Sequence, residues 1–466
     1  MSHRAVMAQA TAIALSVASP TCAAPAFSHI IIVFQENRTP DNLFGSNPTF
    51  EPGVDIASTG LNLAGKSIPL TPVLLNSCYD LGHGHYDFTV MYNNGHMNGA
   101  QNVGVDYAGS CDAGPNPQFR FVDNSTATVQ PYFDLAKQYG FDNRMFQTNE
   151  GPSFPAHQFI FGGTSAPTTT SPLFASENMA NSEAVAGCTA PPGQRVLVID
   201  ARGNESDYPP VYPCFDRPTM ANLLDGAGLS WRYYTNTLAT GSIWNGPAAI
   251  KDICLAQKQN GILNCTGAEY VKNVLPGQAQ VLTDIAHCDL PKVSWVIPTA
   301  QDSDHAGITT ANGPAWVASI VNAVGNQPAC PGGDTYWNNT AIFITWDDWG
   351  GWYDHVPPFH VGGGGAHHWG DGYTYGFRVP LIVVSAYTPA GHVSNNPHDF
   401  GSILRFIEDN FGLAHIGPGY YADAFAAKLD GYFSLSTPRR FQTIPARQNA
   451  AYFLHEPAST IGPDND

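Results

Sequence analysis

The sequence predicts an α/β fold, a three-layer sandwich around a mostly parallel central sheet. Short apolar runs rich in β-branched and aromatic residues recur along the chain, and such uninterrupted runs are typical of strands buried on both faces. Segments with helical spacing separate them. Alternating strands and helices indicate a parallel sheet with helices on its faces. The chain of 466 residues is long enough to bury a large core.

The expected elements follow one another from near the N-terminus. The strongest strand signals lie at residues 29–34, 196–199, 293–297, 341–346 and 379–385. Helices are expected at residues 129–139, 218–227, 268–275, 315–324 and 400–411. Residues from about 165 to about 280 are rich in Pro, Ser, Thr, Asn and Cys, and their strand signals are sparse. We interpret them as a divergent insertion, at the edge of the sheet or as a cap over it.

The charge balance is acidic. The chain has 38 Asp and Glu against 20 Lys and Arg, a formal net charge of −18. This excess argues against a surface that follows nucleic-acid phosphates and against electrostatic docking to anionic lipid. An anionic substrate is still compatible, because a bound metal ion inverts the local field.

The N-terminal segment is typical of a secretory signal. Residues 1–24 begin with Arg4, continue through a modest apolar stretch and end in small residues. An ordinary N-terminal helix is the alternative. We expect export, to the periplasm or outside the cell, of a single domain at residues 25–466. No later run has the ~18 apolar residues of a membrane span.

Eight cysteines remain once the segment containing Cys22 is removed. An even count in an exported chain favours disulfides, and Cys254 with Cys265 is the simplest local pair. The spacing contains no Cys-x-x-Cys motif, which argues against a zinc site made of thiolates.

Acidic residues follow two of the expected strands. Asp347 and Asp348 end the run at residues 341–346, and Glu36 with Asn37 ends the first run. Ligands gather outside the carboxyl ends of parallel strands, so we expect these four side chains to meet. Such an oxygen-rich set suits a divalent cation. Solvated turns, or a glycosylation acceptor at Asn37, are the alternatives.

A hydroxyl and three histidines complete the candidate site. Ser153 follows a Gly-Pro pair where a helix should begin, so it is a candidate nucleophile beside free backbone N–H groups, an N-cap, or both at once. His83, His305 and His355 each follow a strand end or turn, and we expect them to contact a phosphoryl oxygen or protonate a leaving group. The roles of His367 and His368 stay open, as does that of the glycine tract at residues 362–365.

Six segments in this order resemble a bacterial phosphoesterase family that includes phospholipases C and acid phosphatases. They lie at residues 36–45, 80–83, 93–99, 151–155, 346–358 and 378–385. Pro40 stands where the family carries Phe. The resemblance covers residues from about 28 to about 412.

The resemblance implies an alkaline-phosphatase-like fold. Carried over to this sequence, it makes Glu36, Asn37, Asp347 and Asp348 metal ligands and Ser153 the nucleophile. His83, His305 and His355 are then expected to line the phosphoryl pocket. The implied cofactor is a divalent metal ion, either Ca²⁺, Mg²⁺, Mn²⁺ or Zn²⁺.

We therefore expect an exported, metal-dependent phosphoric ester hydrolase of phospholipase C type with a phospho-serine intermediate. A broad-specificity acid phosphatase is one alternative, and a non-catalytic binding protein is another. The expected partner is a phosphorylated small molecule or a phospholipid head group, with no nucleic acid and no obligate protein partner. Three tryptophans could contact a membrane surface transiently or belong to the core; they are Trp349, Trp352 and Trp369.

Overall fold

The computed structural model describes residues 27–107, 111–179, 185–200, 202–236, 241–333, 335–358, 375–460 and 462. The expected signal segment, the glycine tract, His367, His368 and Trp369 lie outside the described residues. Among the helices that are described, none is both long and apolar enough to cross a membrane.

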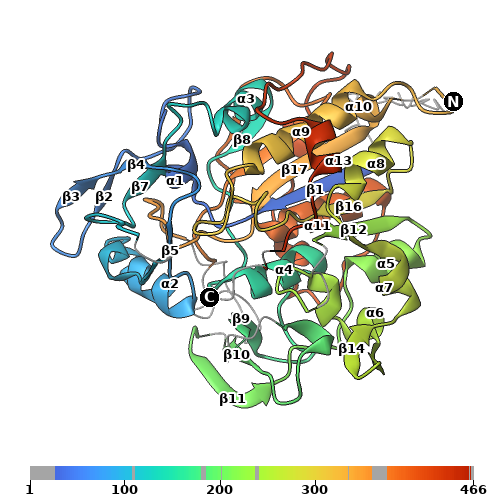
Figure 1. Cartoon of the computed structure of the whole chain (residues 1–466), viewed down its shortest axis with the longest axis horizontal. Coiled ribbons are helices and arrows are strands. Elements are labelled where there is room, and N and C mark those ends of the chain that lie inside the picture. Colours follow the sequence, from blue (N-terminus) through green and yellow to red (C-terminus); the bar gives the residue numbers. More distant parts are fainter. Residues whose placement is uncertain are drawn as a thin grey trace, which may run out of the picture.

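An eight-stranded sheet forms the centre of the molecule (Figure 1). Its strands, in spatial order, are β15 (Val274–Pro276), β12 (Trp231–Thr235), β16 (Val293–Val296), β1 (His29–Gln35), β17 (Thr340–Trp346), β18 (Leu381–Ser385), β8 (Gly140–Asp142) and β19 (His392–Ser394). All neighbours pair in parallel except at β18, which is antiparallel to both β17 and β8. The prediction of an α/β fold with a mostly parallel sheet is confirmed.

Helices cover both faces of this sheet. Phe343 and Trp346 of β17 point to opposite faces, because side chains alternate along a strand. The Phe343 ring contacts Phe406 on one face, and the Trp346 ring contacts Tyr132 on the other. Phe406 belongs to α11 (Phe400–Phe411), and Tyr132 to α3 (Gln130–Gln138). Figure 1 shows α11 with α4 (Ser153–Gly162) on one side and α9 (Gly313–Asn326) on the other.

Every expected helix is present; α11 has the expected bounds, and the others differ by a few residues. Besides α3, α9 and α11, these are α5 (Met220–Gly226) and α7 (Ala268–Asn273). Several short helices were not among the expected elements, namely α1 (Pro40–Phe44), α2 (His85–Tyr92), α6 (Lys251–Cys254), α8 (Gln280–Ala286), α10 (Tyr336–Asn339), α12 (Ala422–Phe425) and α13 (Ala450–His455).

Two strand predictions were wrong in their pairing. Residues 196–199 form β10 (Val196–Ile199), which lies between β9 (Phe174–Met179) and β11 (Glu205–Val211) in a small antiparallel sheet. The run at residues 379–385 gives β18, which is central but antiparallel. An apolar run shows that a strand is buried and does not show in which sheet or direction it pairs. The interval from 165 to 280 also supplies β12 and β15 at one edge of the central sheet.

A second, smaller core lies beside the sheet around residues 59–122 (Figure 1, left). Its short strands are β2 (Thr59–Leu61), β3 (Ser67–Pro69), β4 (Thr71–Val73), β5 (Tyr79–Leu81), β6 (Val105–Tyr107) and β7 (Arg120–Val122). Trp349 and Trp352 pack into this core and are fully buried. The idea that they contact a membrane was therefore wrong, and the core alternative holds for both.

All eight cysteines of the described chain form disulfides. The bonds are Cys78–Cys111, Cys188–Cys214, Cys254–Cys265 and Cys288–Cys330. The predicted Cys254–Cys265 pair is confirmed, and it closes the hairpin of β13 (Ala256–Gln259) and β14 (Ile262–Cys265).

Candidate active site

The ends of β1 and β17 bring the predicted acidic residues together. The two strands pair in parallel with Gln35 opposite Trp346, so Glu36 and Asp347 leave the sheet side by side. The Asn37 backbone N–H donates to Asp347 Oδ1 at 2.9 Å. All four predicted metal ligands, Asp348 included, are completely buried.

The two loops that follow these strands fit closely against each other. Asn37 has a left-handed backbone with φ of 62°, and Gly350 has φ of 60°. A Cβ atom on Gly350 would lie 2.4 Å from the Asn37 carbonyl oxygen. Glycine is therefore required at 350, and this contact fixes the position of Asn37 relative to Asp347.

Helix α4 adds the hydroxyl. Ser153 is its first residue, and the N-cap is Pro152, without a side-chain capping bond. The N-cap alternative for Ser153 is therefore wrong. The Ser153 Oγ lies 3.3 Å from Asp348 Oδ2 and 3.5 Å from Glu36 Oε2. The backbone N–H of Phe154 donates to the Asn178 side chain. The hydroxyl at the start of α4 thus faces the acidic group.

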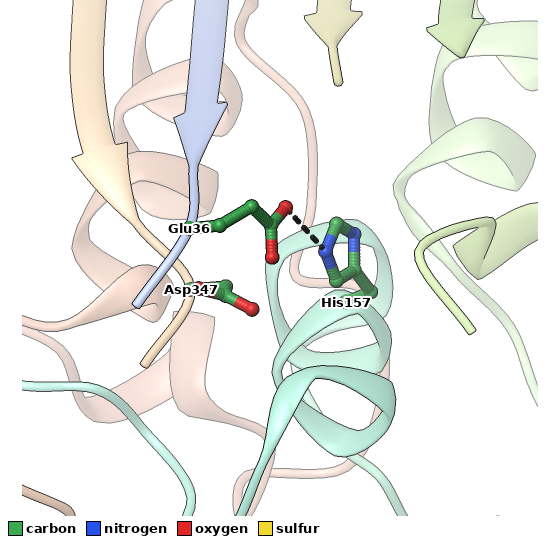
Figure 2. Close-up of side chains that lie close together, drawn as sticks. All are labelled: Glu36, His157 and Asp347. Carbon is green, nitrogen blue, oxygen red and sulfur yellow. Dashed lines mark ion pairs between the residues drawn. The ribbon is translucent and has the colours of Figure 1, made fainter. Parts of the chain in front are cut away.

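One residue of this group was missed by the sequence analysis. His157 lies one helical turn after Ser153, and residues four apart share a helix face. Its Nε2 is 3.4 Å from Glu36 Oε1 (Figure 2). Its Nδ1 donates to the Tyr233 hydroxyl oxygen, because that hydroxyl's own hydrogen goes to the Trp244 carbonyl. The lone pair of Nε2 therefore points at the carboxylates. The i, i+4 spacing from Ser153 was the available signal.

The donor set fits a divalent cation. One ligand atom each from Glu36, His157 and Asp347 lies within 4.8 Å of the other two, and Figure 2 shows the three side chains converging. Four buried atoms of the site make no hydrogen bond to the described residues; they are Glu36 Oε1, Asn37 Oδ1, Asp347 Oδ2 and His157 Nε2. Buried polar atoms are normally bonded, so these unbonded atoms are compatible with a divalent cation held by Glu36, His157 and Asp347.

The electrostatics support the same conclusion. Burial, and then the Asp347 charge, raise the pKa of Glu36 well above its usual range. Burial and Asp347 do the same to the pKa of Asp348. Burial lowers the pKa of His157 to about 4, which leaves its imidazole neutral at pH 7. Several buried carboxylates beside a neutral imidazole are costly unless a cation or a proton neutralises them, so this environment is compatible with a divalent cation.

Two of the three predicted histidines reach the site. The Asn37 amide nitrogen lies 3.1 Å from His83 Nε2 and 3.0 Å from His305 Nε2. Each histidine places its Nδ1 against a backbone carbonyl, that of Leu81 or Ala306. Both Nε2 atoms therefore accept from the two N–H groups of the Asn37 amide, which leaves Asn37 Oδ1 free for a cation.

His355 does not join this group. Its Nδ1 is 2.8 Å from Asp41 Oδ2, and its Nε2 is 3.1 Å from Asp55 Oδ1. It belongs to a neighbouring ion network that includes Arg378. Of the eight predicted site residues, the structure brings together seven and adds His157.

Comparison with known proteins identifies the family. Residues 27–414 match the model of the Phosphoesterase family. The chain belongs to the Phosphoesterase family. Phospholipase C A of Mycobacterium tuberculosis is 27% identical over 237 residues, which cover 47% of this chain and 44% of that protein. Non-specific phospholipase C6 of Arabidopsis thaliana is 28% identical over 334 residues, covering 67% of this chain and 52% of that protein. The matches thus span about half the length of these relatives.

Solved structures give weaker likenesses. A protein in the alkaline phosphatase superfamily from Vibrio parahaemolyticus has a TM-score of 0.35 at 10% identity, over 85% of this chain and 69% of that chain. Phosphonate monoester hydrolase of Agrobacterium radiobacter also has a TM-score of 0.35 at 10% identity, over 89% and 79%.

Proposed function

We propose that this chain is an exported, metal-dependent phosphoric ester hydrolase of phospholipase C type, on an alkaline-phosphatase-like fold. The observation that carries the proposal is the Ser153 hydroxyl, which lies within 3.5 Å of two buried carboxylates at adjacent strand ends. Buried donor atoms without hydrogen bonds surround it. Membership of the Phosphoesterase family and the phospholipase C relatives support this chemistry.

Glu36, Asn37, Asp347 and Asp348 hold the metal ion in this proposal, with His157 as an additional ligand. When bound, the ion lowers the pKa of the Ser153 hydroxyl and neutralises charge on the phosphoryl oxygens. The ligand atoms determine which ion would bind. One imidazole among carboxylates and an amide oxygen favours zinc or manganese over calcium.

Ser153 is the proposed nucleophile. Its proton passes to Asp348, whose Oδ2 lies 3.3 Å away. The bond from Ser153 Oγ to phosphorus forms while the bond from phosphorus to the leaving alkoxide breaks. His305 or His83 gives a proton to that alkoxide in this proposal, after its Nε2 has lost the hydrogen bond from the Asn37 amide and has taken up a proton from solvent. Water then attacks phosphorus and gives a proton to the same histidine. The bond from phosphorus to Ser153 breaks, Ser153 Oγ takes its proton back from Asp348, and the phosphorylated product leaves.

A phospholipase C and an acid phosphatase differ in the bond that they break. The curated relatives are phospholipases C, which favours a phosphodiester substrate with a diacylglycerol leaving group. Asp348, in a position where many family members carry Glu, is the feature that favours the acid phosphatase. A non-catalytic binding protein would have no need to retain Ser153 beside the carboxylates.

A substrate panel tests these alternatives. Purified protein treated with chelator receives single metals, and lipid and phosphate products are measured separately. Diacylglycerol with a phosphorylated head group supports a phospholipase C, whereas inorganic phosphate from simple monoesters supports a phosphatase. If the protein hydrolyses no ester with any of the metals, the remaining alternative is a non-catalytic binding protein.

Two variants of the nucleophile test the mechanism. Ser153→Ala should lower kcat by about 10⁴-fold or more, because the covalent step is lost. Ser153→Thr retains a hydroxyl and should retain part of the activity. Full metal-dependent activity in Ser153→Ala would refute the nucleophile assignment.

Export is part of the same proposal. The four disulfides support an oxidising compartment, since such bonds are rare where thiols are kept reduced. Mass spectrometry of protein recovered outside the cytoplasm should show a chain that lacks residues 1–24. An intact N-terminus on exported protein would contradict this cleavage.

A further inference from the structure

The side chain of Gln147 joins the segment that leads into α4 to the loop that follows β17. Gln147 lies between β8 and α4 in the chain and is completely buried. Its Oε1 accepts from the backbone N–H of Trp349 at 3.1 Å. Its Nε2 donates to the carbonyls of Asn149 at 2.8 Å and Gly151 at 3.0 Å. The one amide therefore uses its acceptor on one loop and both of its donors on the other.

Both loops carry a group that the proposed mechanism uses. Trp349 follows Asp348 directly, and Gly151 comes two residues before Ser153. The Ser153 Oγ and the Asp348 Oδ2 are 3.3 Å apart, although the two residues are separated by 195 positions in the chain. The distance between these two atoms therefore depends on how the two loops are held against each other.

The turn before α4 is held largely by side-chain amides. Pro152, the N-cap of α4, has no N–H group and makes no side-chain capping bond. The Asn149 Nδ2 donates to the Gly151 carbonyl at 2.7 Å. The carbonyls of this turn thus face two side-chain amides, and the amide of Gln147 also reaches the loop after β17.

The Gln147 side chain has little freedom to move. Its backbone N–H donates to the Phe377 carbonyl and its carbonyl accepts from the Gly376 N–H, both at 3.1 Å. A Cβ atom on Gly376 would lie 2.2 Å from Gln147 Cγ, so the side chain fills space that only a glycine leaves open. A buried side chain that makes three hydrogen bonds holds its partners in one arrangement.

We propose that Gln147 is a positioning residue that sets the distance between the Ser153 hydroxyl and the Asp348 carboxylate. Gln147 acts on these two groups through Gly151 and Trp349. This role rests on the proposed function, in which Ser153 attacks phosphorus and gives its proton to Asp348. A displacement of about 1 Å at a catalytic group can lower the rate by about 10²-fold, so loss of the link should lower kcat.

Kinetics and crystal structures of matched variants test this role on the purified protein. Gln147→Met keeps the size of the side chain and removes its hydrogen bonds. Its kcat on the best ester of the substrate panel should fall by about 10²-fold, and its KM should change by less than about threefold. The amount of bound metal should equal that of wild type. In the crystal, the Ser153 Oγ should lie farther from Asp348 Oδ2.

Gln118→Met is the matched control. Gln118 is also buried, and its Nε2 donates to the Val103 carbonyl at 2.8 Å in the second core. This variant loses a buried amide of the same kind, so it should lose stability. Its kcat and the distance from Ser153 Oγ to Asp348 Oδ2 should equal those of wild type.

A second variant, Gln147→Glu, covers the case in which Gln147→Met does not fold. The glutamate still accepts from the Trp349 N–H, but its other oxygen faces the carbonyls of Asn149 and Gly151, which have no hydrogen to donate. Its kcat should therefore fall as well, with the same displacement of Ser153.

Several results would overturn the role of Gln147. One is an unchanged distance between Ser153 Oγ and Asp348 Oδ2 in the Gln147 variants. Another is a kcat equal to that of Gln118→Met, or a loss that lies in KM or in bound metal instead of kcat. Wild-type protein that hydrolyses no ester would refute the proposed function, and the distance in the variants would still decide whether Gln147 positions Ser153.

Discussion

Two buried clusters take their carboxylates from neighbouring positions in the sequence, yet the chemistry of the two clusters differs. The strand-end cluster consists of Glu36, Asp347 and His157, and the arginine-bound cluster consists of Asp41, Asp354 and His355 around Arg378. Both sets of carboxylate and histidine have the spacing of metal ligands. Only the arginine-bound cluster contains a guanidinium, and this difference decides what each cluster can do.

Arg378 binds both carboxylates of the arginine-bound cluster. Its Nε and Nη2 donate to the two oxygens of Asp354 at 2.8 and 2.9 Å, and Nη2 also lies 3.2 Å from Asp41. Its Nη1 donates to the carbonyls of Asp55 and Asn143. The planar fork of Arg donates to both carboxylates and brings one positive charge, so this cluster has less need of a further cation. The strand-end cluster keeps unbonded oxygens and a free imidazole lone pair, as a cofactor site requires.

The largest expected effect follows from removing a carboxylate of the strand-end cluster. Asp347→Asn should lower kcat/KM by about 10³-fold or more, because the proposed metal ion would contribute several kcal/mol to the transition state. The fold should persist, as judged by circular dichroism. Asp289→Asn, which changes an exposed acid paired with Arg232, is the control and should retain activity. Wild-type activity in Asp347→Asn would show that this cluster is not the catalytic one.

The next effect concerns stability and the arginine-bound cluster. Arg378→Met should lower the free energy of unfolding by about 3–5 kcal/mol, because two buried carboxylates lose their counter-ion. Urea denaturation measures this change. Arg195→Met removes a half-exposed ion pair with Asp207 and should cost less than about 1 kcal/mol. Equal costs for the two variants would contradict the role given to Arg378.

A smaller effect, of opposite sign, is expected in the metal-free strand-end cluster. Glu36→Gln should raise the free energy of unfolding of chelator-treated protein by about 1–2 kcal/mol, since it removes one of the repelling buried carboxylates. At saturating metal the wild type should be the more stable of the two proteins, because Glu36→Gln lacks one of the proposed metal ligands. Urea titrations with and without metal give both values, and a destabilised metal-free variant would argue that Glu36 is already compensated.

The smallest effect is a pH dependence at His355. Burial alone lowers the pKa of His355, but the hydrogen bond and charge of Asp41 outweigh it and raise that pKa above the usual value. The stabilisation is therefore fully present below about pH 6.5 and is lost as pH rises through the raised value. His355→Gln should destabilise the protein more at pH 5.5 than at pH 9. A constant difference across that range would show that the charge of His355 does not contribute.

Parts of the strand-end cluster could be predicted because the pattern is local. An apolar run that stops at Asp347 and Asp348 shows both the strand and its end, and the same holds for Glu36 and Asn37. The rule that parallel strands collect ligands at their carboxyl ends then places the two pairs together. His157 required the additional step of reading the helix face that begins at Ser153.

The other features depend on contacts between distant residues. His355 follows a strand end just as a catalytic histidine would, and only folding brings Asp41 and Arg378 against it. Trp349 and Trp352 follow the same strand, and the second core that buries them comes largely from residues 59–122. The sequence of β12, Trp-Arg-Tyr-Tyr-Thr, mixes polar and aromatic residues and gives no continuous apolar run.

The pairing of β1 with β17 also has a consequence for folding kinetics. Asn37 and Asp347, which the pairing joins by a hydrogen bond, are 310 residues apart. A one-residue slip between the strands would turn the side chains to opposite faces and separate the two halves of the cluster. Contacts between such distant segments form slowly because the chain must first close a long loop. Recovery of hydrolysis during refolding should therefore lag behind recovery of helical circular dichroism.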